Sequence, residues 1–185
     1  MSGRRATAAE TSIVEDKYSR LDLTWWSTGA GWSRAYFRVG DHVEDLAVTH
    51  IFDNPNEVIA RATAELVEGA TRATFTWCDE PGAFVFDLER ADQSPRLDGR
   101  FRQFPGSGPR VWETEQPATA ISFTTHLEYW ATLVHASLSR VTLLSKHSLY
   151  TSWNSDVPAP EREFGAIEAF LKRTAHRSLH QSSRA

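Results

Sequence analysis

The hydrophobic pattern that is easiest to interpret has a helical period and lies in residues 54–69. Asn54 and Pro55 are typical of a helix start, because asparagine accepts hydrogen bonds from free N–H groups and proline lacks a donor that would have no partner there. Gly69 tolerates the left-handed exit from a helix. The pattern therefore predicts a helix of about fourteen residues with one buried face. The apolar positions of that face are Val58, Ile59, Ala62 and Leu66.

After Gly69 the pattern changes to an alternation of apolar and polar residues. Residues 73–78, 84–89 and 97–102 each alternate in this way, with aromatic side chains at many of the apolar positions. Pro81-Gly82 between the first two segments predicts a type II turn in which glycine takes a positive φ. The three segments predict an antiparallel meander whose apolar face is covered by the preceding helix.

The N-terminal part of the chain predicts further strands. Residues 18–26 alternate so that Leu21, Leu23 and Trp25 share a buried face while Trp26 points the other way. Residues 36–39 and 42–51 predict a hairpin around Gly40-Asp41. The order predicted up to the meander is therefore strands, helix, strands.

The C-terminal part predicts one long loop, one short strand and two helices. Residues 105–117 are rich in proline and glycine and predict the loop, and residues 119–123 predict the strand. The next helix runs to about residue 144, begins at a capping box formed by Thr125 and Glu128, and is expected to pack on more than one side. The last helix begins near Pro160, and the basic cluster at its other end is explained by the helix dipole more simply than by nucleic-acid contact. That cluster consists of Lys172, Arg173, His176 and Arg177.

These elements predict an α+β fold with a largely antiparallel sheet of six or seven strands and about three helices. A chain of 185 residues with 41% apolar residues is sufficient for one globular core. We expect a single domain at residues 17–177. The polar ends, residues 1–16 and 178–185, are expected to be disordered tails.

Charge and cysteine content exclude several classes of partner. The formal net charge is −4, which gives no overall reason to expect nucleic acid or an anionic membrane as a partner. The single cysteine, Cys78, allows neither an intrachain disulfide nor a cysteine zinc cluster. No apolar segment has the length of a signal peptide or a membrane span. We therefore expect a cytoplasmic protein with no metal and no cofactor.

Tryptophans supply the candidate binding residues. Trp25, Trp26 and Trp32 lie close together in sequence beside a glycine-rich turn. An outward Trp26 can line a ligand cleft or anchor a partner, because indole offers a large rigid surface with one donor. The alternative is a sheet that is covered on both faces. Tyr150 and Trp153, in the irregular segment 145–157, are further binding candidates.

The candidate catalytic residues are His50, Asp79, Glu128 and His135. Asp79 has a second carboxylate beside it at a hairpin tip, where adjacent acids raise each other's pKa or simply favour the turn. Glu128 and His135 lie on one line of the same helix, so proton transfer between them requires a cleft at that place. A polar helix flank is the simpler interpretation of this pair. No dinucleotide, zinc-deaminase or serine-nucleophile motif is complete.

The order of these signals resembles that of small actinobacterial proteins grouped as domains of unknown function. The resemblance lies in Asp53-Asn-Pro55, in Glu65-Leu-Val-Glu-Gly69 and in Trp77-Cys-Asp-Glu-Pro-Gly82 with the strand after it. It covers residues 36–104 and, more loosely, the region of Tyr150, Trp153 and the last helix. The resemblance implies a fold and brings no catalytic residue with it.

Two classes of function fit the sequence. The preferred one is a soluble binding or interaction domain of the toxin-neutralising (immunity) type, because the acidic balance and surplus of aromatic residues accompany an absence of catalytic motifs. The alternative is a small-molecule enzyme of secondary metabolism, of the cyclase or isomerase type, with an aromatic-lined pocket for an apolar substrate. A closed pocket with tryptophans and a buried histidine or carboxylate would favour the enzyme, and an exposed aromatic patch would favour the protein partner.

Overall fold

The computed structural model describes residues 18–29, 31–92, 94–106, 111–145 and 160–182. Within this part the chain forms seven strands and four helices. In chain order they are β1 (Leu21–Gly29), β2 (Trp32–Val39), β3 (His42–Thr49), α1 (Pro55–Val67), β4 (Arg72–Cys78), β5 (Ala83–Glu89), β6 (Arg96–Phe104), α2 (Val111–Thr114), β7 (Thr119–His126), α3 (Leu127–Ser145) and α5 (Glu161–Ser182).

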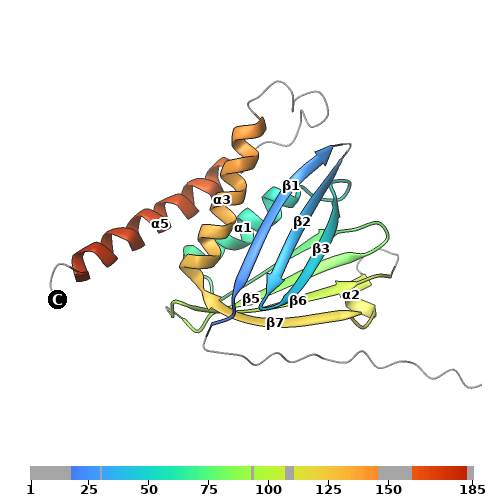
Figure 1. Ribbon diagram of the computed structural model, residues 1–185, viewed down its shortest axis with the longest axis horizontal. Helices are drawn as coiled ribbons and strands as arrows, with labels where there is room; N and C mark the ends of the chain where they lie inside the picture. The colour runs from blue at the N-terminus through green and yellow to red at the C-terminus, as the bar shows by residue number, and fades with distance from the viewer. Residues whose placement is uncertain (1–17, 30, 93, 107–110, 146–159, 183–185) are drawn as a thin grey trace, which may run out of the picture.

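The strands form two antiparallel sheets with seven strands in total, so the predicted α+β fold with six or seven largely antiparallel strands is confirmed, although the strands are divided between two sheets. One sheet has the order β1-β2-β3 and the other has the order β4-β5-β6-β7. The two sheets cross at a steep angle (Figure 1). Helix α1 connects the two sheets, since it follows β3, the last strand of the first sheet, and precedes β4, the first strand of the second.

The core lies between the inner faces of the two sheets and is dominated by aromatic rings. The ring of Phe37 on β2 lies 5.1 Å from that of Phe86, 5.2 Å from that of Phe101 and 5.6 Å from that of Phe123, measured between centroids. These four residues come from four strands and are all buried. Edge-to-face and tilted contacts of this kind add to the free energy gained from burial alone.

Helix α1 starts as the sequence predicts. The Asn54 side chain accepts a hydrogen bond from the Asn56 N–H at 2.9 Å, and Pro55 occupies the first turn. The prediction of one buried face is wrong, because ten of the thirteen helix residues are buried and only a narrow charged stripe is exposed. The cause is packing on several sides, by β4, α3 and α5. The exposed stripe consists of Glu57, Arg61 and Glu65.

Three tryptophans attach the rest of the molecule to α1. The Trp25 indole N–H donates to Asn56 Oδ1 at 2.7 Å, and the Trp77 N–H donates to the Pro55 carbonyl at 3.0 Å. A third indole N–H, that of Trp130 on α3, donates to the Thr63 hydroxyl at 3.0 Å. Each buried indole therefore has a partner on one helix, which fixes where both sheets and α3 sit around it.

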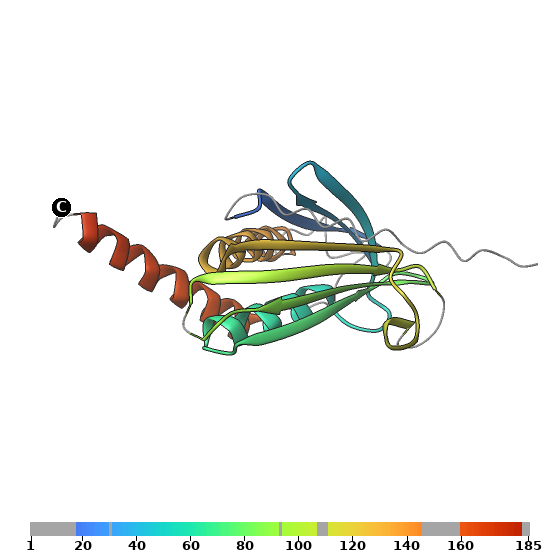
Figure 2. The same cartoon turned by 90° about the horizontal axis from the view of Figure 1, so that it is seen from below.

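Helix α3 packs on more than one side, as predicted, but its start differs from the prediction. Strand β7 continues to His126, and the Leu127 N–H donates to the Pro95 carbonyl at 2.8 Å, so the capping box expected at Thr125 and Glu128 is replaced by a direct strand-to-helix junction. The last helix, α5, continues to Ser182, beyond the predicted domain boundary at residue 177. Its C-terminal part extends away from the body of the molecule (Figures 1 and 2).

Two connections also differ from the predictions. The Glu80–Pro81 peptide bond is cis, so the β4–β5 turn is not type II, and Gly82 has no positive φ. Glycine is needed at this position for another reason, since an added Cβ would collide with the Phe104 carbonyl of β6. The predicted loop at residues 105–117 contains the short helix α2, whose Trp112 packs on a small apolar group of the outer sheet face. That group consists of Ala83, Val85 and Phe104.

Candidate functional site

Among the described residues, the outer face of sheet β1-β2-β3 is open to solvent. It carries two aromatic residues that are suitable for contact with a partner. Strand alternation sends Leu23, Trp25 and Phe37 into the core and places Trp26 and Tyr36 outside. Trp26 lies opposite Arg34 in the register, and Tyr36 lies opposite Thr24 on β1 and Asp45 on β3. The prediction that Trp26 points away from Leu21, Leu23 and Trp25 is confirmed.

Trp26 and Tyr36 form a preorganised aromatic pair on this face. Their ring centroids are 5.4 Å apart with an interplanar angle of 41°. The guanidinium carbon of Arg140 on α3 lies 5.9 Å from the Trp26 ring centroid, within the range of a cation–π contact. Tyr36 is 42% exposed and Trp26 is half-buried. The pair is therefore held in place from two directions and still reaches solvent.

Ion pairs on both sides of the aromatic pair fix the surrounding side chains. Arg34 forms a bidentate contact with Asp45, with Nε donating at 2.7 Å and Nη2 at 2.6 Å. The hydrogen bond from Arg34 and its positive charge lower the pKa of the Asp45 carboxyl. Arg38 Nη2 lies 3.4 Å from Asp22 on β1. Planar arginine forks fix geometry more than they add stability at exposed positions.

The other predicted binding residues have different positions. Trp25 is 1% exposed and belongs to the core, so a partner cannot reach it, and its assignment to a binding surface is corrected. The reason is its inward position on β1 and its hydrogen bond to Asn56. Trp32 is half-buried at the start of β2, where its carbonyl accepts from the Ser27 and Thr28 hydroxyls. Tyr150 and Trp153 lie outside the described residues.

His50, a catalytic candidate, is paired with a buried serine. Its Nε2 lies 2.7 Å from Ser33 Oγ, and burial lowers the pKa of its imidazole. Ser33 is 5% exposed, so its hydroxyl is not presented to a substrate as a nucleophile would be. This serine–histidine pair is a satisfied polar contact at the end of the sheet.

Asp79 and Cys78 lie at the β4–β5 turn. Burial raises the pKa of the Asp79 carboxyl, whose oxygen also accepts from the Glu80 N–H at 2.8 Å. Burial and the negative charge of Asp53 raise the pKa of the Cys78 thiol. A thiol with a raised pKa has little thiolate at neutral pH and is a poor nucleophile.

Glu128 and His135 face different surroundings along α3. His135 stacks on Phe164 of α5 at 4.6 Å, and its Nε2 is buried without a hydrogen-bond partner among the described residues. Glu128 is exposed and lines a cavity of about 330 Å³ at the start of the helix. The cleft that proton transfer between the two requires is therefore present at Glu128, and His135 does not line it.

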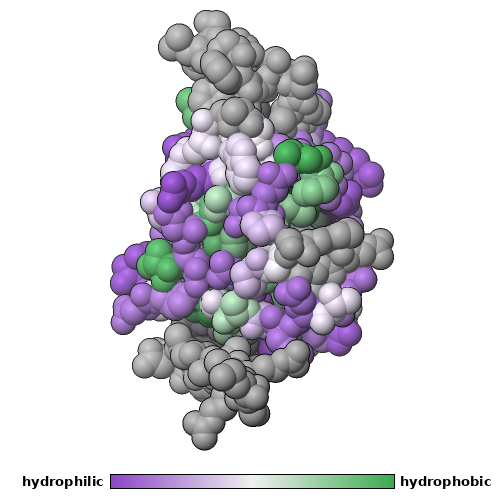
Figure 3. All heavy atoms as spheres, turned by 90° about the vertical axis from the view of Figure 1, so that its right-hand side faces the viewer, coloured by the Kyte–Doolittle hydropathy of each residue, from purple (hydrophilic) through white to green (hydrophobic). Residues whose placement is uncertain are grey.

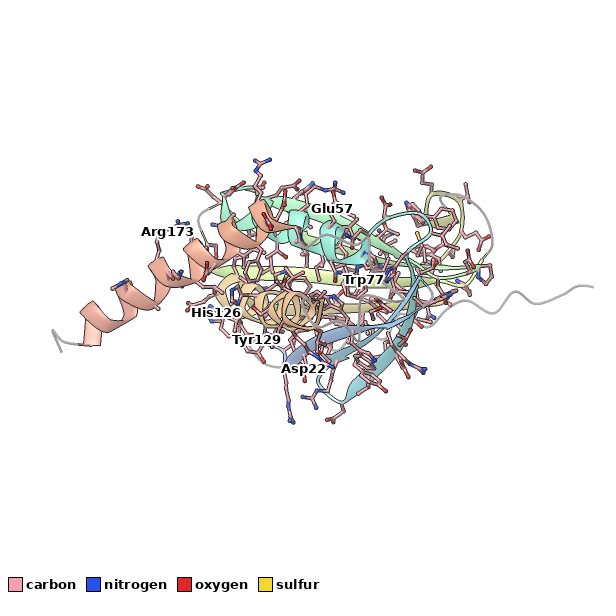
Figure 4. The ribbon with its side chains drawn as sticks, turned by 90° about the horizontal axis from the view of Figure 1, so that it is seen from above. Asp22, Glu57, Trp77, His126, Tyr129 and Arg173 are labelled. Carbon is pink, nitrogen blue, oxygen red and sulfur yellow. The ribbon has the colours of Figure 1, made fainter. Side chains whose placement is uncertain are left out.

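That cavity is polar and lies between the end of α1, the β7–α3 junction and α5. Arg90, His126 and Arg173 line it together with Glu68 and Glu128, and none of its described lining residues is a tryptophan. Figure 4 shows His126 and Arg173 at the same end of the molecule. Arg90 is 7% exposed and donates to the carbonyls of Leu66 and Asp92, so it satisfies the C-terminal end of α1. This lining differs from the aromatic pocket that the enzyme alternative requires.

Sequence reasoning missed two exposed apolar residues, Ile51 and Phe52, in the connection from β3 to α1. Each is 65% exposed. The predicted strand 42–51 includes Ile51, whereas β3 ends at Thr49, so Ile51 lies outside the sheet. The signal available in the sequence was their position directly before the helix start at Asn54, where the chain is already outside the sheet.

Two further features concern metals and membranes. Among the described residues no group of three or more His, Cys, Asp or Glu side chains is placed to hold a metal ion. In the same part of the chain no helix combines the length and the apolar composition needed to cross a membrane.

Comparisons with known proteins leave the function open. No protein-family model matches the chain, and no curated protein matches it. The resemblance to small actinobacterial proteins therefore stays a prediction. A chain of the CdiA-CT/CdiI toxin and immunity complex from Enterobacter cloacae aligns with 12% identity over 64% of this chain and 99% of that chain, at a TM-score of 0.40. A likeness at this TM-score carries no argument about function.

Proposed function

We propose that the chain is a protein-binding domain of the toxin-neutralising type, which contacts its protein partner through the outer face of sheet β1-β2-β3. The observation that carries the proposal is the exposed Trp26–Tyr36 pair, held by Arg140 and bordered by ordered ion pairs. Tryptophan, tyrosine and arginine are the residues in which protein–protein interfaces concentrate their binding energy. In this proposal the two proteins meet in the cytoplasm.

Preorganisation supports this surface over the rest of the molecule. Binding costs side-chain entropy wherever a flexible group must be ordered, and the Trp26–Tyr36 pair and the Arg34–Asp45 pair are already ordered by their neighbours. The strands beneath it are rigid, since their inner side chains are part of the core. A small-molecule enzyme is less well supported, because the described cavity is polar and His50 is paired with a buried serine.

The test uses the protein encoded by the reading frame adjacent to this chain's gene. Expressed alone, that protein is expected to arrest growth, and co-expression of the present chain is expected to restore it. The double variant Trp26→Ala/Tyr36→Ala should lose protection, and its affinity for the purified adjacent protein should fall about tenfold or more, as is typical for hot-spot aromatics.

A matched control is Phe52→Ala, which truncates another exposed aromatic residue, 65% exposed, in the connection between β3 and α1 and not on the strands of this face. It should protect as the wild type does. The proposal fails if no adjacent protein arrests growth, or if the double variant, shown by circular dichroism to be folded, protects fully.

A further inference from the structure

The polar cavity of about 330 Å³ is bordered by elements from distant parts of the chain. The end of α1 at Val67 forms one side, and the β7–α3 junction at His126 and Leu127 forms another. Phe170 and Arg173 of α5 lie on a third side, and the connection between β5 and β6 completes the wall. A volume of this size is at the lower end of the range for ligand pockets and suits a molecule the size of an amino acid.

Contacts between distant segments hold the walls of this cavity in place. The Leu127 N–H donates to the Pro95 carbonyl at 2.8 Å, which joins the β7–α3 junction to the connection between β5 and β6. The His126 ring stacks on the ring of Tyr18, with the two centroids 4.0 Å apart. Because the walls are already fixed in the free protein, a ligand would bind with little cost of reorganisation.

Arg90 lines the cavity as a buried cation with one donor left over. It is 7% exposed, and its Nε and Nη1 donate to the carbonyls of Asp92 and Leu66 at 2.8 Å and 3.0 Å. The remaining nitrogen, Nη2, bonds to no described residue and is not closed off by protein atoms, so it reaches the cavity. No carboxylate of the described residues forms an ion pair with Arg90. Since a buried charge without an opposite charge is costly, an anionic group of a ligand would supply what Arg90 lacks.

The other charged groups around the cavity have both signs. Arg173, Glu68 and Glu128 are exposed and line it together with Arg90. When His126 is neutral, the described lining therefore has two positive and two negative side chains. Neither arginine forms an ion pair with either glutamate in the part of the chain that the structure describes. The cavity thus offers positive and negative groups that are not already neutralising one another.

Helix α1 adds to the negative groups of the cavity. The helix ends at Val67, its C-cap is Glu68, and both residues line the cavity with Gly69. The last carbonyl groups of a helix have partial negative charge and accept hydrogen bonds from outside the helix. A positively charged ammonium group at this place would therefore meet carbonyl oxygens as well as carboxylates.

We propose that this cavity binds a free amino acid with an apolar side chain. Arg90 and Arg173 hold the carboxylate of the ligand by charge-assisted hydrogen bonds. Glu68, Glu128 and the last carbonyl groups of α1 hold its ammonium group. The inference goes beyond the proposed function, since it concerns a small ligand and a different part of the molecule from the outer face of sheet β1-β2-β3.

The lining of the cavity argues against other small ligands. The glutamates and the end of α1 would repel a phosphate or another polyanion, and the arginines would repel a cation without an acidic group. An uncharged ligand would leave the buried charge of Arg90 without an opposite charge. Val67, Leu127 and Phe170 line the same cavity and provide apolar surface for the side chain of the amino acid.

The combination of a concave shape and convergent polar groups marks this end of the molecule. Figure 4 shows His126 and Arg173, which come from two different elements, at the same end. On the side opposite to α5, Figure 3 shows a mainly hydrophilic surface on which the described hydrophobic residues lie in small separate groups. Ligand sites need the concavity together with the polar groups, and the cavity at the end of α1 has both.

The experiment titrates the full-length protein with L-leucine and L-phenylalanine by calorimetry, at up to about 10 mM because ligands of this size bind weakly. At least one of the two is expected to bind. Its methyl ester lacks the carboxylate, and its N-acetyl derivative lacks the ammonium group. Each derivative is expected to bind about tenfold more weakly or worse, the loss typical of a hydrogen bond to a charged group. Inorganic phosphate, as the polyanion, is expected not to compete.

Variants connect the binding to this cavity. Arg173→Gln and Glu128→Gln each change one exposed lining residue, so the fold should stay intact, and each should weaken binding about tenfold. Arg162→Gln on α5 and Glu65→Gln on α1 are the matched controls, because they remove exposed charges of the same kinds that do not line the cavity. Both controls should bind the amino acid as the wild type does.

Combining variants with derivatives assigns each charged group of the ligand to its residue. In Arg173→Gln the difference in affinity between the amino acid and its methyl ester should shrink, and in Glu128→Gln the difference from the N-acetyl derivative should shrink. Trp26→Ala/Tyr36→Ala should bind the amino acid as the wild type does. This last variant distinguishes failure of the inference from failure of the proposed function.

Three outcomes would overturn the inference. The first is that neither amino acid binds. The second is that the methyl ester and the N-acetyl derivative bind as tightly as the amino acid, or that phosphate displaces it. The third is that Arg173→Gln and Glu128→Gln, shown by circular dichroism to be folded, both bind the amino acid with wild-type affinity.

Discussion

Neighbouring residues of one strand have opposite roles in this protein. Trp25 donates its indole N–H to Asn56 inside the core, and Trp26, the next residue, carries the exposed pair with Tyr36. The alternation of polar and apolar residues predicts these two directions correctly. It does not predict the acceptors, because Asn56 and Thr63 are polar residues whose burial depends on tryptophans distant in sequence.

The partial burial of the His50 imidazole predicts that the stability of the folded protein depends on pH. Because burial lowers the pKa of His50 below its ordinary value of 6.5, the unfolded chain binds the proton first as the pH falls. The contribution of this residue to stability is therefore present above about pH 6.5 and is lost as the pH falls toward the folded-state pKa. His50→Gln removes the titration and keeps a polar partner for Ser33.

We expect the free energy of unfolding, measured in urea at a series of pH values, to decline less steeply for His50→Gln than for the wild type between about pH 7 and pH 5. The difference in slope is below about 1.4 kcal/mol per pH unit, the value for one proton, because the ring is partly exposed. Asp79, whose pKa burial raises, acts with the opposite sign, since its contribution is lost as the pH increases through its folded-state pKa. Parallel pH curves for the two proteins would contradict the expectation.

At the scale of elements, local signals determine which elements form and distant contacts determine how they pack. The hairpin around Gly40, strands β4 to β6 and the start of α1 all follow from period and turn residues. The all-round burial of α1, the separation into two sheets and the helix inside residues 105–117 do not. Each of these depends on which surface is available after the other elements have packed. The local sequence pattern of a single segment does not contain information about these tertiary contacts.

The start of α1 gives a prediction about one element. Asn54→Ala removes the acceptor for the Asn56 N–H and should lower the free energy of unfolding by about 0.5–2 kcal/mol. Asn54→Asp keeps an acceptor and adds a negative charge near the positive end of the helix, so it should retain most of the wild-type stability. Denaturation in urea with circular dichroism measures both. Equal losses in the two variants would mean that the cap does not contribute.

For the whole molecule, α1 is the most enclosed of the three long helices and α5 is the least enclosed of them. Only Ile167 of α5 is fully buried among the residues whose side chains are described, and the helix continues away from the body. Buried, hydrogen-bonded elements open only with the whole structure, and exposed ones open locally. The molecule is therefore expected to be least stable at its C-terminal helix.

Hydrogen exchange measured by mass spectrometry should show this gradient, with slow exchange in α1 and fast exchange in the second half of α5. Ile167→Ala should increase exchange throughout α5 by undocking it and leave α1 slow under conditions where the core stays folded. The substitution of an exposed residue of the same helix, Ala169→Ser, serves as the control. Equal acceleration in α1 and α5 would show that the two helices open as one unit.

The division into two meanders also affects how the chain can fold. Each described strand pairs with its neighbours along the sequence, so the hairpins can close without waiting for a remote segment. The connection between β6 and β7, which contains α2, is longer than the others. The step that requires long-range contacts is then the packing of the β1–β3 half against the β4–β7 half, around helix α1, which joins them. Synthesis from the N-terminus would deliver the β1–β3 half complete before the second half leaves the ribosome.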